Sequence, residues 1–253
     1  MKPSVLLTRA EADNRRLAAR LAEYGVATAS LPLLAIEPME EGPAERTLIL
    51  DLDRYHAVMV VSPVAARLGL ERLDRYWPQL PMGVHWFAVG AATAAELEAY
   101  GLRVQVPAQG QTSEALLALP IWRDLLAIEG LRVLIWRGAG GRELLADNVR
   151  AAGGQVDYLE LYRRVAPPGL EQRLTDAAQK GVRSIVIASG QGLQHWHQAS
   201  GSRWEQWRTW RCWVPSQRVA SLARDMGCTD VIVCEGADDQ AVVAAVTANP
   251  LTA

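Results

Sequence analysis

The chain has 253 residues, half of them hydrophobic and 21% charged, which is the composition of a globular protein with enough apolar material for two cores. Its formal net charge of −2 argues against the basic surface that nucleic-acid-binding proteins use to replace counterions along the phosphates. Of the 26 basic residues 24 are arginine, whose planar fork suits carboxylates, although a coding bias explains this equally well. The composition is therefore compatible with a small anionic ligand.

Three cysteines, Cys212, Cys228 and Cys234, are odd in number and lack a CxxC spacing, which argues against a disulfide framework and against a zinc site. The opening residues run directly into a strand pattern, and no apolar run reaches the length of a signal peptide or a membrane span. We therefore expect a cytoplasmic protein with reduced thiols, no metal and no membrane attachment.

Short runs of β-branched and large apolar residues alternate with amphipathic stretches of about 10 to 15 residues, the pattern of parallel sheets with helical crossovers. Leu17, Leu21 and Tyr24 share one helical face, which should cover a sheet. The predicted strands, in chain order, are Val5–Thr8, Ala27–Leu31, Ala57–Val61, Trp86–Val89, Arg103–Val106, Val133–Trp136, Val156–Glu160, Ser184–Ala188, Cys212–Val214 and Val231–Cys234.

Residues 5–38 and 133–166 are two copies of one strand-helix-strand unit. A shift of 128 residues superposes Val5-Leu6-Leu7-Thr8-Arg9 on Val133-Leu134-Ile135-Trp136-Arg137, with eight identities over 34 positions and no gap. At a similar offset, residues 60–63 match 187–190, and residues 89–93 match 214–218. An ordered series of this kind indicates an internal duplication and two similar lobes.

Two extended segments that end in proline occupy equivalent places in the two copies, near 31–38 and 161–167. Such a pair predicts linkers, with the chain leaving one lobe at the first and returning at the second. On this interpretation residues 1–37 and 167–253 form the first lobe, and residues 38–166 form the second.

Two arginines, Arg9 and Arg137, follow the ends of duplicated strands, where a guanidinium can meet an acidic group in a cleft between the lobes. Ion pairing inside each lobe is the structural alternative. Tyr162 lies in the second linker, where its phenol can reach a ligand or a neighbouring backbone carbonyl.

Four hydroxyl residues stand at strand-to-helix turns, where each can cap the helix that follows and needs no ligand to do so. They are Ser62, Thr93, Ser189 and Ser216. In an open parallel sheet these turns gather at the carboxyl edge of the strands, where helix N-termini direct free amides outward and ligands bind. Contact with an acidic ligand is therefore the functional interpretation of the same residues.

Other patterns favour structure over chemistry. His195 and His197 are two residues apart, which turns them to different faces of a helix and argues against a metal pair. The tryptophans between 196 and 213 have the spacing of a packed helix face as well as that of a binding platform, and core packing is favoured. The glycine-rich turn at 138–141 is only half of a dinucleotide fingerprint, so an organic cofactor has little support.

Weak signals then combine along the whole chain: Val5-Leu6-Leu7-Thr8-Arg9 with Asn14, Pro32-Leu33-Leu34-Ala35-Ile36-Glu37-Pro38, Val61-Ser62-Pro63, Ala88-Val89-Gly90 with Thr93, Leu161-Tyr162-Arg163, and Ser216 with Arg218. With the repeat and the linkers, they resemble the uroporphyrinogen-III synthase family. Two positions depart from the family pattern, because Gln217 replaces a frequent hydroxyl and Gly190 replaces the proline after Ser189.

The resemblance implies two flavodoxin-like α/β lobes, each a parallel sheet flanked by helices, joined by a two-stranded linker. It implies a monomer that needs no cofactor and closes the linear tetrapyrrole hydroxymethylbilane, a polycarboxylate, with inversion of its last ring and loss of water. Tyr162 is the expected catalytic acid. The expected substrate-binding residues are Arg9, Ser62, Pro63, Gly90, Thr93, Arg137, Ser189, Gly190, Ser216 and Arg218.

Two other classes of protein compete with this enzyme. A non-catalytic, hinged two-lobe module that binds or senses a small ligand would have the same repeat and the same linkers. A nucleotide-dependent α/β transferase would need a phosphate-binding loop, and the sequence contains no Walker motif.

Overall fold

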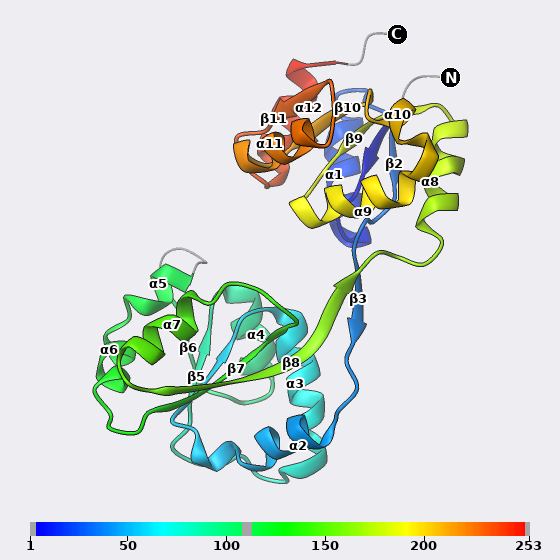
Figure 1. Ribbon diagram of the computed structural model, residues 1–253. Helices are drawn as coiled ribbons and strands as arrows, with labels where there is room; N and C mark the ends of the chain where they lie inside the picture. Colours follow the sequence, from blue (N-terminus) through cyan, green and yellow to red (C-terminus); the bar gives the residue numbers. More distant parts are fainter. Residues whose placement is uncertain (1–3, 108–112, 251–253) are drawn as a thin grey trace. The chain divides into compact units, whose positions relative to one another are not determined.

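The computed structural model describes residues 4–107 and 113–250, which fold into two compact units (Figure 1). Unit 1 combines the chain up to Ala35 with the chain from Val165 onward, and unit 2 runs from Ile36 to Arg164. Each unit contains one sheet with helices packed on both of its faces. The fold class predicted from the sequence, α/β with two sheets of parallel strands flanked by helices, is confirmed.

The sheet of unit 1 has the order β11-β10-β9-β1-β2, and its paired strands are parallel. Helices α8, α9, α10 and α11 cover one face, and α1 and α12 cover the other. The elements are β1 (Ser4–Leu7), α1 (Glu11–Ala22), β2 (Thr28–Ser30), α8 (Leu170–Gln179), β9 (Val182–Val186), α9 (Gly190–Ser200), α10 (Trp204–Trp207), β10 (Arg211–Val214), α11 (Gln217–Asp225), β11 (Val231–Val233) and α12 (Asp239–Ala248).

The sheet of unit 2 has the order β3-β8-β7-β4-β5-β6. Helices α2, α3 and α4 pack on one face, and α5, α6 and α7 on the other. The elements are β3 (Ala35–Pro38), α2 (Pro43–Leu50), β4 (Ala57–Val60), α3 (Pro63–Tyr76), β5 (His85–Ala88), α4 (Ala91–Ala99), β6 (Val104–Gln105), α5 (Ser113–Leu117), α6 (Pro120–Leu126), β7 (Arg132–Gly138), α7 (Leu144–Ala151) and β8 (Gln155–Val165).

The two sheets repeat one topology. Reading β11-β10-β9-β1-β2 beside β6-β5-β4-β7-β8 pairs each strand with its equivalent, so the duplicated segments are β1-α1-β2 and β7-α7-β8. In unit 1 this is the flavodoxin-like strand order. All paired strands are parallel, but the direction in which the chain adds strands to the sheet reverses between β1 and β9. The equivalent reversal in unit 2 lies between β7 and β4, and this type of fold binds ligands at the carboxyl ends of such a strand pair.

All ten predicted strands are present, with boundaries that differ by two residues at most, except that β8 continues to Val165. It is longer because the segment expected as a linker goes on forming a strand, beside β3. Leu17 and Leu21 are fully buried as predicted, but Tyr24 lies beyond the end of α1 and is 63% exposed. The tryptophans between 196 and 213 are buried in the core of unit 1, as core packing requires.

Candidate functional site

A pocket of about 320 Å³ opens at the carboxyl ends of the unit 2 strands, where β7 and β4 meet. It lies at the reversal point of the sheet, where open α/β folds bind ligands. Three of the residues predicted from the sequence line it together: Ser62 after β4, Arg137 in β7 and Tyr162 in β8. The other lining residues are Val61, Val89, Ile135, Gly138, Gly140, Gly141, Arg142, Leu145 and Arg164.

Ser62 stands between strand β4 and helix α3. Its extended backbone makes it the N-cap, and its Oγ accepts a hydrogen bond from the Ala65 amide at 3.1 Å. Pro63 takes the first helical position, where its missing N–H costs nothing. The same Ser62 Oγ lies 3.0 Å from the phenol oxygen of Tyr162, so one hydroxyl serves the helix and the pocket.

Tyr162 reaches the pocket because strand β8 contains a bulge. Arg137 pairs with Glu160, but the next residue, Gly138, pairs with Tyr162, so Leu161 has no partner on β7. Strict alternation would put Tyr162 on the opposite face from Leu161, whereas both pack in the same core cluster. The bulge therefore turns the phenol ring into the side of the sheet that α3 covers.

Gly138 makes room for this ring. A Cβ at position 138 would lie 2.6 Å from the Tyr162 ring, closer than packed carbon atoms approach. The Ala139 amide also donates to the Tyr162 carbonyl at 2.7 Å, which holds the bulged backbone in place. Tyr162 is therefore almost completely buried, with 2% of its surface exposed.

Arginines surround the phenol and the pocket. Nη2 of Arg164 donates to the Tyr162 oxygen at 3.3 Å, and the guanidinium lies 5.6 Å from the ring centre. Arg137 is held by Glu143 at 2.8 Å and Glu160 at 3.2 Å. A hydrogen bond from Tyr158 and the pair with Arg137 lower the pKa of Glu143 to about 2, so this carboxylate stays charged at neutral pH.

Gly90 and Thr93 lie at the start of α4, next to the pocket residue Val89. Gly90 is the N-cap, so the expectation that the Thr93 hydroxyl caps this helix is wrong. Thr93 occupies the third helical position, because the helix begins three residues earlier than a cap at Thr93 would require, and the residue is 3% exposed.

In unit 1, Ser189 and Ser216 cap α9 and α11 by accepting from the amides of Gly192 at 3.1 Å and Val219 at 3.5 Å. Gly190 and Arg218 lie together, since a Cβ on Gly190 would be 3.7 Å from Nη1 of Arg218. Arg218 is exposed, and its guanidinium has no hydrogen bond or ion pair within residues 4–107 and 113–250.

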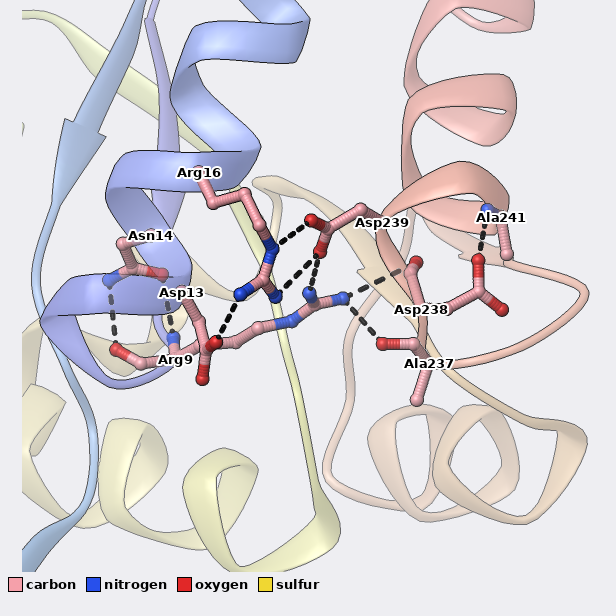
Figure 2. A network of polar contacts seen from close by, with 8 residues as sticks. All are labelled: Arg9, Asp13, Asn14, Arg16, Ala237, Asp238, Asp239 and Ala241. Atoms are coloured by element: carbon pink, nitrogen blue, oxygen red, sulfur yellow. Dashed lines mark hydrogen bonds and ion pairs between the residues drawn. The ribbon is translucent and has the colours of Figure 1, made fainter. Parts of the chain in front are cut away.

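Arg9 is engaged inside unit 1, by a carboxylate far along the chain. Arg9 and Arg16 converge on Asp239 at the start of α12 (Figure 2). Each has a nitrogen 2.6 Å from a carboxylate oxygen of Asp239. Arg9 also donates to the Ala237 carbonyl at 2.6 Å. Hydrogen bonds from Arg16 and then Arg9 lower the pKa of Asp239. This network ties the 237–239 turn to the end of β1.

In the part of the chain that the structure describes, no three histidine, cysteine, aspartate or glutamate side chains gather in a way that could hold a metal ion. None of the helices over the same residues is both long and apolar enough to cross a membrane. The glycine-rich turn has positive φ at Gly140 and Gly141, and it forms one wall of the pocket.

Residues 15–244 match the family model described as uroporphyrinogen-III synthase HemD. The chain belongs to the uroporphyrinogen-III synthase family. It is 34% identical to the uroporphyrinogen-III synthase of Escherichia coli K12 over 255 residues, which cover 96% of this chain and 99% of that one.

Two solved structures with the same fold are more distant in sequence. A mutant uroporphyrinogen III synthase from Thermus thermophilus matches with a TM-score of 0.57 and 16% identity, over 94% of this chain and 96% of that one. The enzyme from Helicobacter pylori matches with a TM-score of 0.54 and 11% identity, over 96% and 97%. At these identities the likeness shows the two-lobe fold alone.

Arg164 and Gly138 contact Tyr162 in the pocket, and neither was predicted as a site residue from the sequence. Arg164 follows Tyr162 by two positions, and the period of a strand places such residues on one face. That spacing could have indicated Arg164, had residues 161–165 been expected as a strand. For Gly138 the sequence contains no equivalent signal, because its role depends on a ring that reaches it from another strand.

Proposed function

We propose that this chain is a uroporphyrinogen-III synthase, a cyclising hydro-lyase. It converts hydroxymethylbilane, a linear tetrapyrrole polycarboxylate, into uroporphyrinogen III with inversion of the last ring and loss of water. The observation that carries the proposal is the unit 2 pocket, in which a buried phenol, a serine and arginines meet in a chain that matches the Escherichia coli enzyme from end to end.

The arginines are suited to the substrate carboxylates. Arg218 is the best placed of the predicted ones, because its exposed guanidinium is uncommitted within the described residues. Arg9 and Arg137 each have 12% exposed side chains and acidic partners, so in this proposal they shape the strand ends more than they hold substrate. The other proposed contacts are Ser62, Pro63, Gly90, Thr93, Ser189, Gly190 and Ser216.

The main requirement of the reaction is that the flexible substrate be held in the reactive orientation. A hydroxyl leaves an electron-rich pyrrole readily, and uncatalysed closure competes, so holding the flexible chain in one reactive shape is the principal catalytic contribution. The last ring then attacks through its substituted carbon to give a spiro intermediate, which fragments and recloses in inverted orientation. In this scheme Tyr162 assists departure of the hydroxyl by providing a proton or hydrogen bond.

Mixing the purified protein with hydroxymethylbilane and separating the product isomers tests the function. We expect type III product, formed faster than the type I product of spontaneous closure. Type I product alone would favour the hinged binding module, because a protein that only binds the substrate would not invert its last ring.

We also propose that the enzyme acts as a cytoplasmic monomer without a nucleic-acid partner. Its 27.7 kDa chain mass makes the oligomeric state easy to measure by light scattering. A mass near that of one chain at the concentrations of the assay is the expected result, and a mass near twice that value would contradict it.

A further inference from the structure

The phenol of Tyr162 lies in a short chain of polar groups, all within unit 2. Arg164 donates to the phenol oxygen at 3.3 Å, the phenol oxygen lies 3.0 Å from Ser62 Oγ, and Ser62 Oγ accepts from the Ala65 amide at 3.1 Å. Arg164, Tyr162 and Ser62 all line the same pocket. The order of the chain is therefore guanidinium, phenol, serine.

Counting donors shows that one proton of this chain is left for the pocket. A guanidinium and a backbone N–H can only donate, so the Tyr162 oxygen accepts one hydrogen bond from Arg164 and the Ser62 oxygen accepts one from Ala65. The bond between Ser62 and Tyr162 uses one of their two hydroxyl protons. The other hydroxyl proton has no partner in this chain of groups and can be given to a ligand.

Two features favour Ser62 as the group that keeps the free proton. A phenol is a stronger hydrogen-bond donor than an aliphatic hydroxyl, which favours the arrangement in which Tyr162 donates to Ser62. Tyr162 is 2% exposed whereas Ser62 is only partly buried, so a ligand reaches the serine more easily.

We propose that Ser62 is the hydroxyl that touches the departing oxygen of the substrate, with Tyr162 supplying its proton through Ser62 and Arg164 positioning the phenol. This rests on the proposed synthase function. As the carbon–oxygen bond breaks, its electron pair leaves with the oxygen, which takes the Ser62 proton and becomes water. The Tyr162 proton moves to Ser62, and Arg164 faces the resulting phenolate. The proton lost from the ring carbon after closure restores the phenol.

Single-turnover formation of type III product from hydroxymethylbilane tests the relay. Glycine is tolerated at the N-cap position, so Ser62→Gly removes the hydroxyl with little loss of stability in α3. We expect Ser62→Gly and Tyr162→Phe each to slow the step by roughly 100-fold, the lower end of general acid catalysis. The double variant should be no more than about twofold slower than the slower single one, because both remove one proton path.

Ser62→Thr keeps a hydroxyl and should recover most of the rate. A proton inventory in mixed H₂O and D₂O should be curved for the unmodified protein, since two protons move together, and linear for Ser62→Gly. Arg164→Gln should slow the step about tenfold through loss of one charge-assisted hydrogen bond. Arg163→Gln is the matched control, because Arg163 pairs with Glu37 at 2.6 Å on the surface.

An unchanged rate in Ser62→Gly, or a double variant slowed by the product of the two single effects, would overturn the relay. Failure of the unmodified protein to make type III product would instead reject the proposed synthase function. The two failures are distinguishable because the second is visible before any variant is made.

Discussion

Ser62 and Ser189 occupy equivalent positions in the two units, yet only one of them has a chemical neighbour. Each follows a central strand and caps the next helix through an amide at 3.1 Å. Ser62 also contacts the phenol of Tyr162, whereas the position in unit 1 that matches Tyr162 in the repeat holds Leu34. Within the described residues, Ser189 Oγ makes only its capping bond.

The comparison separates what duplication preserved from what it allowed to change. The cap is present in both units because α3 and α9 each need a hydrogen-bond acceptor at their first turn. The phenol occurs only in unit 2. The glycine that leaves room for its ring, Gly138, also occurs only there, since the matching residue of unit 1 is Ala10. Two similar lobes can thus share one architecture and differ in the side-chain contacts at equivalent strand ends.

The largest expected effect on stability comes from removing the acidic partners of the duplicated arginines, Arg9 and Arg137. Asp239→Asn should lower the free energy of unfolding by about 3 kcal/mol, because it leaves the largely buried Arg9 without a charged partner. Glu143→Gln is the matched change beside Arg137 and should cost less, since Glu143 is 44% exposed and Glu160 still pairs with Arg137. Urea unfolding followed by tryptophan fluorescence measures both. Equal losses would contradict the contrast.

The same network should make unit 1 sensitive to acid. The pKa of Asp239 is lowered in the folded state, so its contribution is complete above the pKa of an unfolded aspartate and is lost as the pH falls through the folded value. We therefore expect the difference between the unmodified protein and Asp239→Asn to shrink below about pH 4. Urea midpoints at pH 7 and pH 3 provide the measurement, and a constant difference would show that Asp239 does not titrate this way.

Gly138→Ala would make unit 2 resemble unit 1 at the matched position. The added Cβ meets the Tyr162 ring at 2.6 Å, so the ring or the end of β7 must move. We expect a loss of about 2 kcal/mol in unfolding free energy, typical of overpacking, together with a fall in type III synthesis. Gly192→Ala is a useful control for glycine substitution, because the backbone of Gly192 does not have a positive φ and a Cβ there would make only ordinary contacts, at 3.5 Å or more. Retained activity and stability in Gly138→Ala would show that Tyr162 can shift without consequence.

The smallest expected effects are those of the two caps. Ser62→Ala and Ser189→Ala should each lower unfolding free energy by about 1 kcal/mol, the usual cost of losing an N-cap hydroxyl. Their chemical rates should differ, because only Ser62 contacts Tyr162. Thermal unfolding measures the first quantity and single-turnover kinetics the second. A similar slowing of the chemical step in both variants would remove the distinction between the two serines.

Much of the fold could be predicted because its determinants are local. Buried parallel strands are short apolar runs, and caps such as Ser62, Ser189 and Ser216 lie directly before the helices they start. The prediction for Thr93 was wrong because glycine can also be an N-cap, so Gly90 caps the helix three residues before the threonine. Core packing was the favoured interpretation of the tryptophans near residue 204, and the structure confirms it.

The sequence by itself determined the repeat, the strands and the turns, since each depends on residues close together in the chain. Only the tertiary structure decided where Arg9 and Tyr162 direct their polar groups. Arg9 pairs with Asp239, which lies 230 residues further along the chain. Tyr162 points toward Ser62 because β8 has a bulge, in which Leu161 has no partner and Tyr162 pairs with Gly138. A one-residue bulge moves the side chains that follow it to the other face of the sheet. The residues of β8 alone do not predict the bulge, because it arises from the pairing of two strands.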